Sequence, residues 1–114
     1  MKIGVDSGAS DHMCFSLNKF HSYNCISDKG HMITVPDGRK IKVKYMGTVK
    51  LPNGVILLNV LYVPQFRFNL ISVNKLLADL KCKLTFDNIG CHVQEHLMKK
   101  HWLLGKAQIR ALCV

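Results

Sequence analysis

The stretch "KIGVDSGASDHM" (residues 2–13) carries the strongest structural and chemical signal in this chain. Residues that can extend into a strand lead directly into Asp6-Ser7-Gly8-Ala9. Such a segment is ordinary turn chemistry, because aspartate and serine bond to nearby backbone and glycine adopts unusual backbone angles. It also contains the residue types of a catalytic loop, so a plain turn and half of a carboxylate pair are both open interpretations.

A catalytic aspartate pair needs the four residue types of this segment in this order. Two carboxylates about 3 Å apart cannot both ionise, so one acts as acid while the other acts as base on a water molecule. Ser7 can fix the carboxylate plane, Gly8 lets two backbones approach closely, and Ala9 avoids a clash. The chain has only one Asp-Ser-Gly, so a monomer could not build such a pair.

The residues that follow predict a hairpin. In residues 41–45, Ile41, Val43 and Tyr45 alternate with lysines, which is typical of a half-buried strand with one wet side. Residues 32–35 form a second strand candidate, and Pro36-Asp37-Gly38 lies between the two as strong turn chemistry. We therefore expect a β-hairpin over residues 32–45 with its tip near Asp37-Gly38.

The rest of the chain predicts more strands and one helix. We expect strands at 47–51 and at 55–63, the latter covered on both faces because its apolar run is continuous. Apolar spacing favours a short helix within 70–80, followed by a strand at 81–86 and a turn at 87–90. For the C-terminal part we favour strands with a turn at Gly105, with a helix over 93–103 as the alternative. The fold class is therefore mainly β, a small closed barrel with one short helix.

Composition limits the possibilities further. The 114 residues suggest a single domain, 1–114, and 16 basic against 7 acidic residues give a net charge of +9. This excess favours contact with a polyanion such as nucleic acid. Five cysteines, no signal-peptide pattern and no apolar run of membrane-spanning length lead us to expect a reduced intracellular compartment and no membrane contact.

Three segments together resemble a known family. "DSGASDHM" (6–13), "VPDGRKIKVKYMGTVKL" (35–51) and "LYVPQFRFNLISVNKL" (61–76) are similar to the protease segment of copia-type (Tnt-type) retrotransposon Pol polyproteins. The resemblance implies a closed retropepsin-like β-barrel and an aspartic endopeptidase that cleaves the Gag-Pol polyprotein as a homodimer. It implies no cofactor and no metal, and a cytoplasmic location in the virus-like particle of the element.

The resemblance also assigns roles to particular residues. Asp6 would be the catalytic aspartate, and Ser7, Gly8 and Ala9 would complete its loop. Residues 32–44 would form a flap over the substrate, with its tip at Asp37-Gly38. The flap residues assigned to the site would be Val35, Pro36, Asp37, Gly38 and Arg39. The element that packs behind the catalytic loop would be Leu70, Ile71 and Ser72.

Departures from the family pattern keep a second interpretation open. Only five residues precede Asp6, Gly4 replaces a larger apolar residue, and an acid–arginine pair of retroviral relatives is replaced by Ser10 and Val73. The chain would then be an N-terminally truncated domain or a fragment of a Pol polyprotein. The alternative function is an inactive or domesticated barrel that serves as an interaction or nucleic-acid-binding module.

Other motifs compete with the aspartate segment. "HVQEH" (92–96) matches the inverted zinc-protease pattern, which needs His92 and His96 on one helical face and a third ligand. His101 or Cys113 could supply that ligand only in an unusual site, and surface residues on a strand or loop are the simpler interpretation.

A second cluster is rich in cysteine and histidine but lacks the spacing of a structural zinc site, so we expect buried cysteines beside surface histidines; its members are His12, Cys14, His21, Cys25 and His31. The basic residues Lys40, Lys42, Lys44 and Lys50 have no aromatic residues alternating with them, which favours a solvated strand face over a nucleic-acid platform. A weak nucleic-acid contact stays open.

Overall fold

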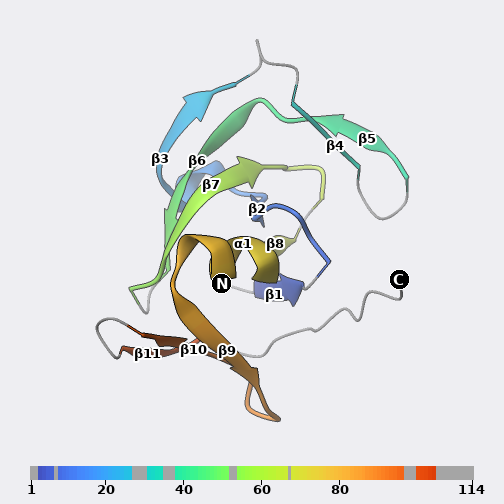
Figure 1. Ribbon diagram of the computed structural model, residues 1–114. Coiled ribbons are helices and arrows are strands. Elements are labelled where there is room, and N and C mark those ends of the chain that lie inside the picture. The colour runs from blue at the N-terminus through green and yellow to red at the C-terminus, as the bar shows by residue number, and fades with distance from the viewer. Residues whose placement is uncertain are drawn as a thin grey trace.

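The computed structural model describes residues 3–6, 8–26, 31–34, 38–51, 54–66, 68–96 and 100–104. These residues form a mainly β structure with one α-helix, as the sequence predicts (Figure 1). The helix is α1 (Val73–Asp79), and a short 3-10 turn, η1, covers Leu17–Lys19. The strands are β1 (Ile3–Asp6), β2 (Met13–Cys14), β3 (Phe20–Cys25), β4 (Met32–Thr34), β5 (Lys40–Lys42), β6 (Tyr45–Lys50), β7 (Ile56–Tyr62), β8 (Asn69–Ser72), β9 (Cys82–Phe86), β10 (Cys91–Glu95) and β11 (His101–Leu103).

Three sheets organise these strands. The main sheet has six strands in the order β1-β8-β2-β7-β6-β3, with β1 parallel to β8 and β2 parallel to β7. Strands β9, β10 and β11 form an antiparallel sheet, and β4 pairs with β5 as a hairpin. The expected closure into a barrel is not confirmed, because no pairing within the described part of the chain joins the edge strands β1 and β3.

Two buried clusters lie on opposite faces of the main sheet. Val60 and Leu61 are consecutive on β7, so their side chains point to opposite faces, and each belongs to a different cluster. The larger cluster joins β1, β8 and α1 to Cys91 and Val93 of β10. The smaller cluster joins the β4–β5 hairpin to β7 through Ile33, Ile41, Val43, Leu61 and Val63. Figure 1 shows the hairpin and the three-stranded sheet at opposite ends of the molecule.

The hairpin over 32–45 is confirmed in its paired part. Met32 lies opposite Lys42, and Thr34 lies opposite Lys40. Gly38 adopts a φ of 90°, a region that favours glycine, as the turn chemistry requires. The predicted flap residues Val35, Pro36 and Asp37 lie outside the described residues.

Strand β7 is not covered on both faces along its whole length, which corrects the prediction for residues 55–63. Ile56 and Leu58 are each 46% exposed. A register shift against β6 lies at this point, and Asn59 has a φ of 52°, so the strand bulges. Only beyond the bulge do consecutive residues, Val60 and Leu61, become buried on both faces.

The C-terminal part is built of strands, and the alternative of a helix over 93–103 is wrong. Strand β10 pairs with both β9 and β11, with Val93 opposite Leu84 on one side and Trp102 on the other. The chain reverses between Glu95 and His101. The predicted turn at Gly105 lies outside the described residues. Among the helices that the structure describes, none is long and apolar enough to cross a membrane.

Candidate active site

Asp6 ends strand β1 in the interior of the molecule. Strand β1 runs parallel to β8, and the register places Asp6 opposite Ser72. The aspartate is 8% exposed, and its Oδ1 accepts a hydrogen bond of 2.8 Å from the backbone N–H of Gly8. This bond closes a tight turn directly after the strand and fixes the carboxylate. Ser7, within the turn, lies outside the described residues.

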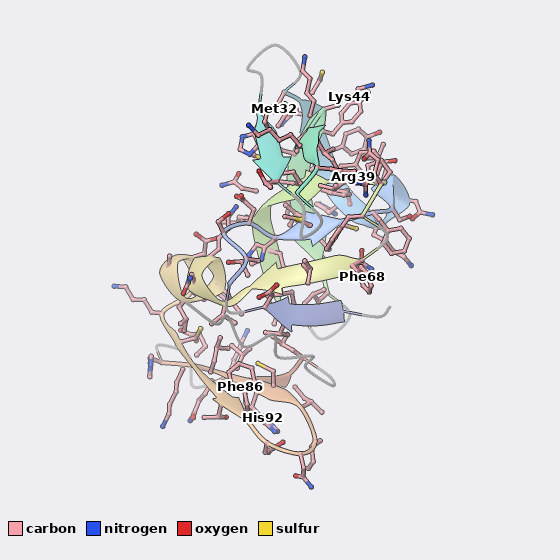
Figure 2. The ribbon with its side chains drawn as sticks, turned by 90° about the vertical axis from the view of Figure 1, so that its right-hand side faces the viewer. Met32, Arg39, Lys44, Phe68, Phe86 and His92 are labelled. Carbon is pink, nitrogen blue, oxygen red and sulfur yellow. The ribbon has the colours of Figure 1, made fainter. Side chains whose placement is uncertain are left out.

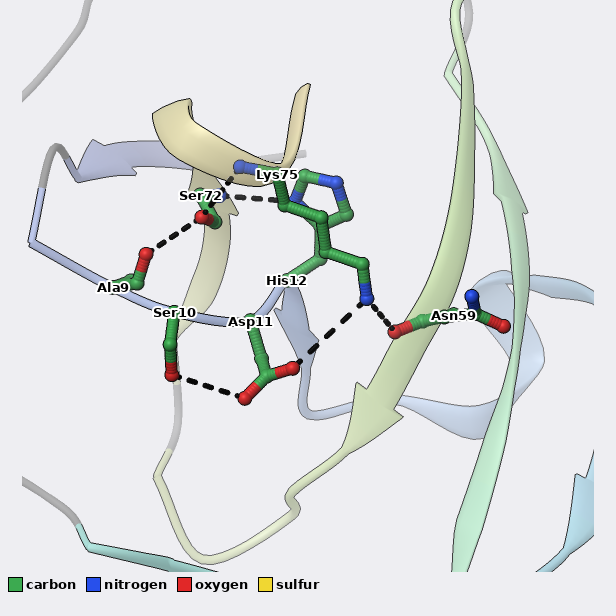
Figure 3. A network of polar contacts seen from close by, with 7 residues as sticks. All are labelled: Ala9, Ser10, Asp11, His12, Asn59, Ser72 and Lys75. Atoms are coloured by element: carbon green, nitrogen blue, oxygen red, sulfur yellow. Dashed lines mark hydrogen bonds and ion pairs between the residues drawn. The ribbon is translucent and has the colours of Figure 1, made fainter. Parts of the chain in front are cut away.

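The loop after Asp6 is tied to the start of helix α1 through Ser72 (Figure 3). The Ser72 hydroxyl donates to the carbonyl of Ala9 at 2.6 Å and accepts from the backbone N–H of Lys75 at 3.2 Å. The second of these bonds is an N-cap, which satisfies a backbone donor that the helix leaves unpaired. Leu70 and Ile71, which precede Ser72 on β8, are 9% and 1% exposed. The structure thus brings residues 70–72 next to the Asp6 loop.

His12 is a buried part of this arrangement that sequence reasoning missed. Its side chain is 0% exposed, and its Nδ1 accepts the backbone N–H of Ser72 at 2.9 Å. Its Nε2 has no hydrogen-bond partner within the described residues. Burial, followed by the nearby Lys75 charge, lowers the pKa of His12 to about 4, against a smaller opposing effect of Asp11. His12 is therefore a neutral acceptor that holds Ser72 in place.

A signal for His12 existed in the sequence. His12 is two residues before Cys14, which is buried on β2, so the period-two rule places both side chains on one face. The Cys/His-rich patch was expected to combine buried cysteines with surface histidines. The structure corrects this in two places, because His12 is buried whereas Cys25 is exposed on β3.

The side chain of Lys75 lies on the outer side of the loop that follows Asp6. The Lys75 ammonium donates to the carbonyl of Asn59 at 2.8 Å and lies 4.0 Å from Asp11 Oδ1. Asn59 is the bulged residue of β7, so the bulge supplies the acceptor for this lysine. Asp11 also accepts a bond of 3.1 Å from the Ser10 hydroxyl. Asp11 thus acts as a partly exposed structural acid.

The other candidate residues lie elsewhere. Gly38 and Arg39 are exposed beside strand β5 of the hairpin. The metal motif at 92–96 does not form a helical face, because His92 and Glu95 lie on strand β10 and His96 follows it in a turn. In the part of the chain that the structure describes, no group of three or more His, Cys, Asp or Glu residues is arranged to hold a metal ion.

The buried thiols are poor nucleophiles. Burial raises the pKa of the Cys91 thiol to about 11, and burial also raises the pKa of Cys14. The thiolate is the reactive form, so both groups stay protonated at neutral pH. Cys91 belongs to the larger buried cluster and Cys14 lies in it too, which makes them packing residues.

The comparison with protein families matches residues 4–81 to the family described as the Pol polyprotein, beta-barrel domain. The match spans well over half of the chain, and the chain therefore belongs to this family. It includes Asp6 and its loop, the hairpin, β8 and helix α1. A search of curated proteins found no match.

Acidification is expected to destabilise the fold through His12. Its pKa is about 4 in the folded chain against 6.5 for an ordinary histidine, so the unfolded state binds more protons between these values. The contribution of neutral His12 to the free energy of unfolding is fully present above pH 6.5. The free energy of unfolding falls by about 3 kcal/mol as the pH drops to about 4. Urea unfolding at pH 7 and at pH 4 measures this loss.

His12→Asn is the matched control for this experiment. The asparagine Oδ1 can replace Nδ1 as acceptor for the Ser72 N–H, but it does not titrate. The wild-type and His12→Asn chains have all other titrating groups in common. The difference between their slopes of unfolding free energy against pH therefore reports on His12 alone. Equal slopes for the two chains would show that His12 is not held neutral by its surroundings.

Proposed function

We propose that this domain is the retropepsin-like aspartic endopeptidase of a copia-type retrotransposon. Its substrate would be the Gag-Pol polyprotein of the element, cleaved in the cytoplasm within the virus-like particle. The observation that carries the proposal is the setting of Asp6. It belongs to the single Asp-Ser-Gly of the chain, ends a buried strand, and is held by the Gly8 N–H at 2.8 Å. Membership of the Pol polyprotein family is consistent with this origin.

The catalytic unit would be a homodimer in which each chain contributes one Asp6. One carboxylate would be ionised and the other protonated, because two adjacent negative charges repel each other. The ionised group would take a proton from water as its oxygen attacks the scissile carbonyl, and the protonated group would donate to the carbonyl oxygen. Collapse of the tetrahedral intermediate would transfer a proton to the departing amine. No covalent enzyme intermediate forms, and no metal takes part.

The contacts around Asp6 suit this mechanism. The backbone N–H of Gly8 donates to Asp6 Oδ1 and fixes the plane of the carboxylate. Ser72 anchors Ala9, and His12 anchors Ser72, so the loop that carries the aspartate is fixed from behind. A fixed loop is what positioning two carboxylates within hydrogen-bond distance requires.

The second candidate function is a non-catalytic barrel that binds nucleic acid or another partner. It is favoured by the outer side of the β4–β5 hairpin, where Lys40 and Lys42 are exposed and Met32 is 52% exposed. Positive charge on such a surface attracts polyanions whether or not the chain has enzymatic activity.

Incubation of the purified chain with a Gag-Pol segment of its own element at about pH 5–6 tests the proposed function, since an acid–base carboxylate pair works near this range. We expect cleavage at defined bonds that a statine-containing peptide blocks, because its hydroxyl mimics the tetrahedral intermediate. A chain that binds a single-stranded oligonucleotide and leaves the segment uncut would favour the non-catalytic candidate.

A further inference from the structure

His92 and His101 come together on the outer face of the three-stranded sheet. His92 lies between the buried residues Cys91 and Val93 on β10, so its side chain points away from the core. His101 begins β11, where it is opposite Gln94, one diagonal step from His92. The two rings stack with their centroids 5.2 Å apart, and His92 Nδ1 lies 3.2 Å from His101 Nε2.

The carboxylate of Asp87 contacts the other nitrogen of the His92 ring, Nε2. Its Oδ2 lies 2.8 Å from His92 Nε2. Asp87 itself is fixed, because its Oδ1 accepts from the backbone N–H groups of Ile89 and Gly90 at 2.8 and 3.0 Å. This contact fixes the orientation of the His92 ring, in which Nδ1 faces His101.

We propose that His92 Nδ1 and His101 Nε2 bind a divalent transition-metal ion of the zinc class, with Asp87 as the carboxylate behind the first ligand. Two nitrogens 3.2 Å apart, each about 2.1 Å from a shared metal, subtend about 100° at it, close to tetrahedral. A carboxylate on the far nitrogen of a ligating histidine is the usual support for such a ligand.

Metal binding needs a lone pair on each of the two facing nitrogens. The His101 proton moves through solvent from Nε2 to Nδ1, which frees Nε2 as the second ligand. Water completes the coordination, since no third His, Cys, Asp or Glu joins the pair among the described residues. A site with two protein ligands has moderate affinity and exchanges its metal readily.

This site differs from the one that the sequence motif suggests. His92 and His96 are four residues apart along an extended chain, which separates them by about 13 Å. The backbone N–H of His96 is bonded to the carbonyl of Lys81. Figure 2 shows His92 at the end of the molecule away from Met32 and Lys44 of the hairpin region, so the metal site is independent of the proposed proteolytic function.

Zinc titration of the ¹⁵N-labelled full chain at about pH 7.5, where histidine is mostly neutral, tests the proposal. Long-range proton–nitrogen spectra resolve each imidazole nitrogen. We expect Zn²⁺ to shift His92 Nδ1 and His101 Nε2. We expect His101→Gln to weaken the binding at least tenfold, and Asp87→Asn to weaken it about tenfold. His96→Gln is the matched control and should leave the affinity unchanged. His101 and His96 are both exposed, so we expect both variants to fold like the wild type. Their backbone spectra check this.

Three results would overturn the proposal. The first is Zn²⁺ shifts confined to residues near the thiols, such as the exposed Cys25. The second is equal affinity in the wild-type chain and in His101→Gln. The third is loss of affinity in His96→Gln, which would assign the ion to the sequence motif instead.

Discussion

An Asp6→Asn chain is expected to lose at least about 10³-fold in kcat/KM for cleavage of the Gag-Pol segment. Asparagine has nearly the same shape as aspartate, and its side-chain oxygen can still accept from the Gly8 N–H. The amide cannot share a proton with the partner carboxylate or take one from water. Steady-state kinetics on the purified variant measure the loss, and its circular dichroism spectrum checks the fold.

Asp11→Asn is the control for this variant. Asp11 is in the same loop, five residues later, but its carboxylate is engaged with Ser10 and Lys75 at the surface. Its replacement removes one negative charge and one partly exposed ion pair with a long N–O distance of 4.0 Å, and such pairs contribute little. Activity within a few-fold of the wild type is expected. A comparable loss in both variants would mean that the effect comes from the loop as a whole and not from the Asp6 carboxylate.

A Gly47→Ala chain is expected to lose more than about 3 kcal/mol of stability. Gly47 lies opposite Tyr23 where β6 meets the edge strand β3. A Cβ at this position would clash with the backbone oxygen of Ser22 and would lie 2.6 Å from the Cα of Tyr23. Both neighbours are backbone atoms, so the two strands must separate. The edge-to-face contacts of Tyr23 with Phe20 and Tyr45 would be disturbed as well.

Gly38→Ala separates the steric effect from the general loss of a glycine. Gly38 has nothing within 4 Å of a Cβ, so only its φ of 90° opposes a side chain. A loss of about 1–2 kcal/mol is expected there. Chemical denaturation of the two variants beside the wild type measures both. Equal losses for Gly38→Ala and Gly47→Ala would contradict the close approach of β3 to β6.

The features that the sequence predicted are those with local signals. Apolar spacing predicted a short helix within 70–80, and α1 covers Val73–Asp79. Turn residues and alternation predicted the β4–β5 pair, and the Asp87–Gly90 turn lies where the sequence placed it. In each case the information lies within a few neighbouring residues.

The features that were not predicted from the sequence depend on contacts between residues far apart in the chain. His12 accepts a hydrogen bond from Ser72, 60 residues further along the chain, and no local pattern encodes that partner. Ile56 and Leu58, which precede the bulge at Asn59, are exposed, although the composition of this segment suggested burial on both faces. For the candidate site, the motif predicted Asp6, Gly8 and Ala9. Only the resemblance to the family suggested residues 70–72. No feature of the sequence indicated that His12 accepts a hydrogen bond from Ser72 and holds it in place.

Mixing wild-type and Asp6→Asn chains tests most directly whether two copies of Asp6 form one active site. At equal amounts and fixed total concentration, random pairing leaves about one quarter of the dimers with two aspartates. Activity is expected to fall to about one quarter of that of the pure wild type, since a pair with one aspartate lacks the shared proton. A fall to about one half would mean that each chain acts alone, which would contradict the account.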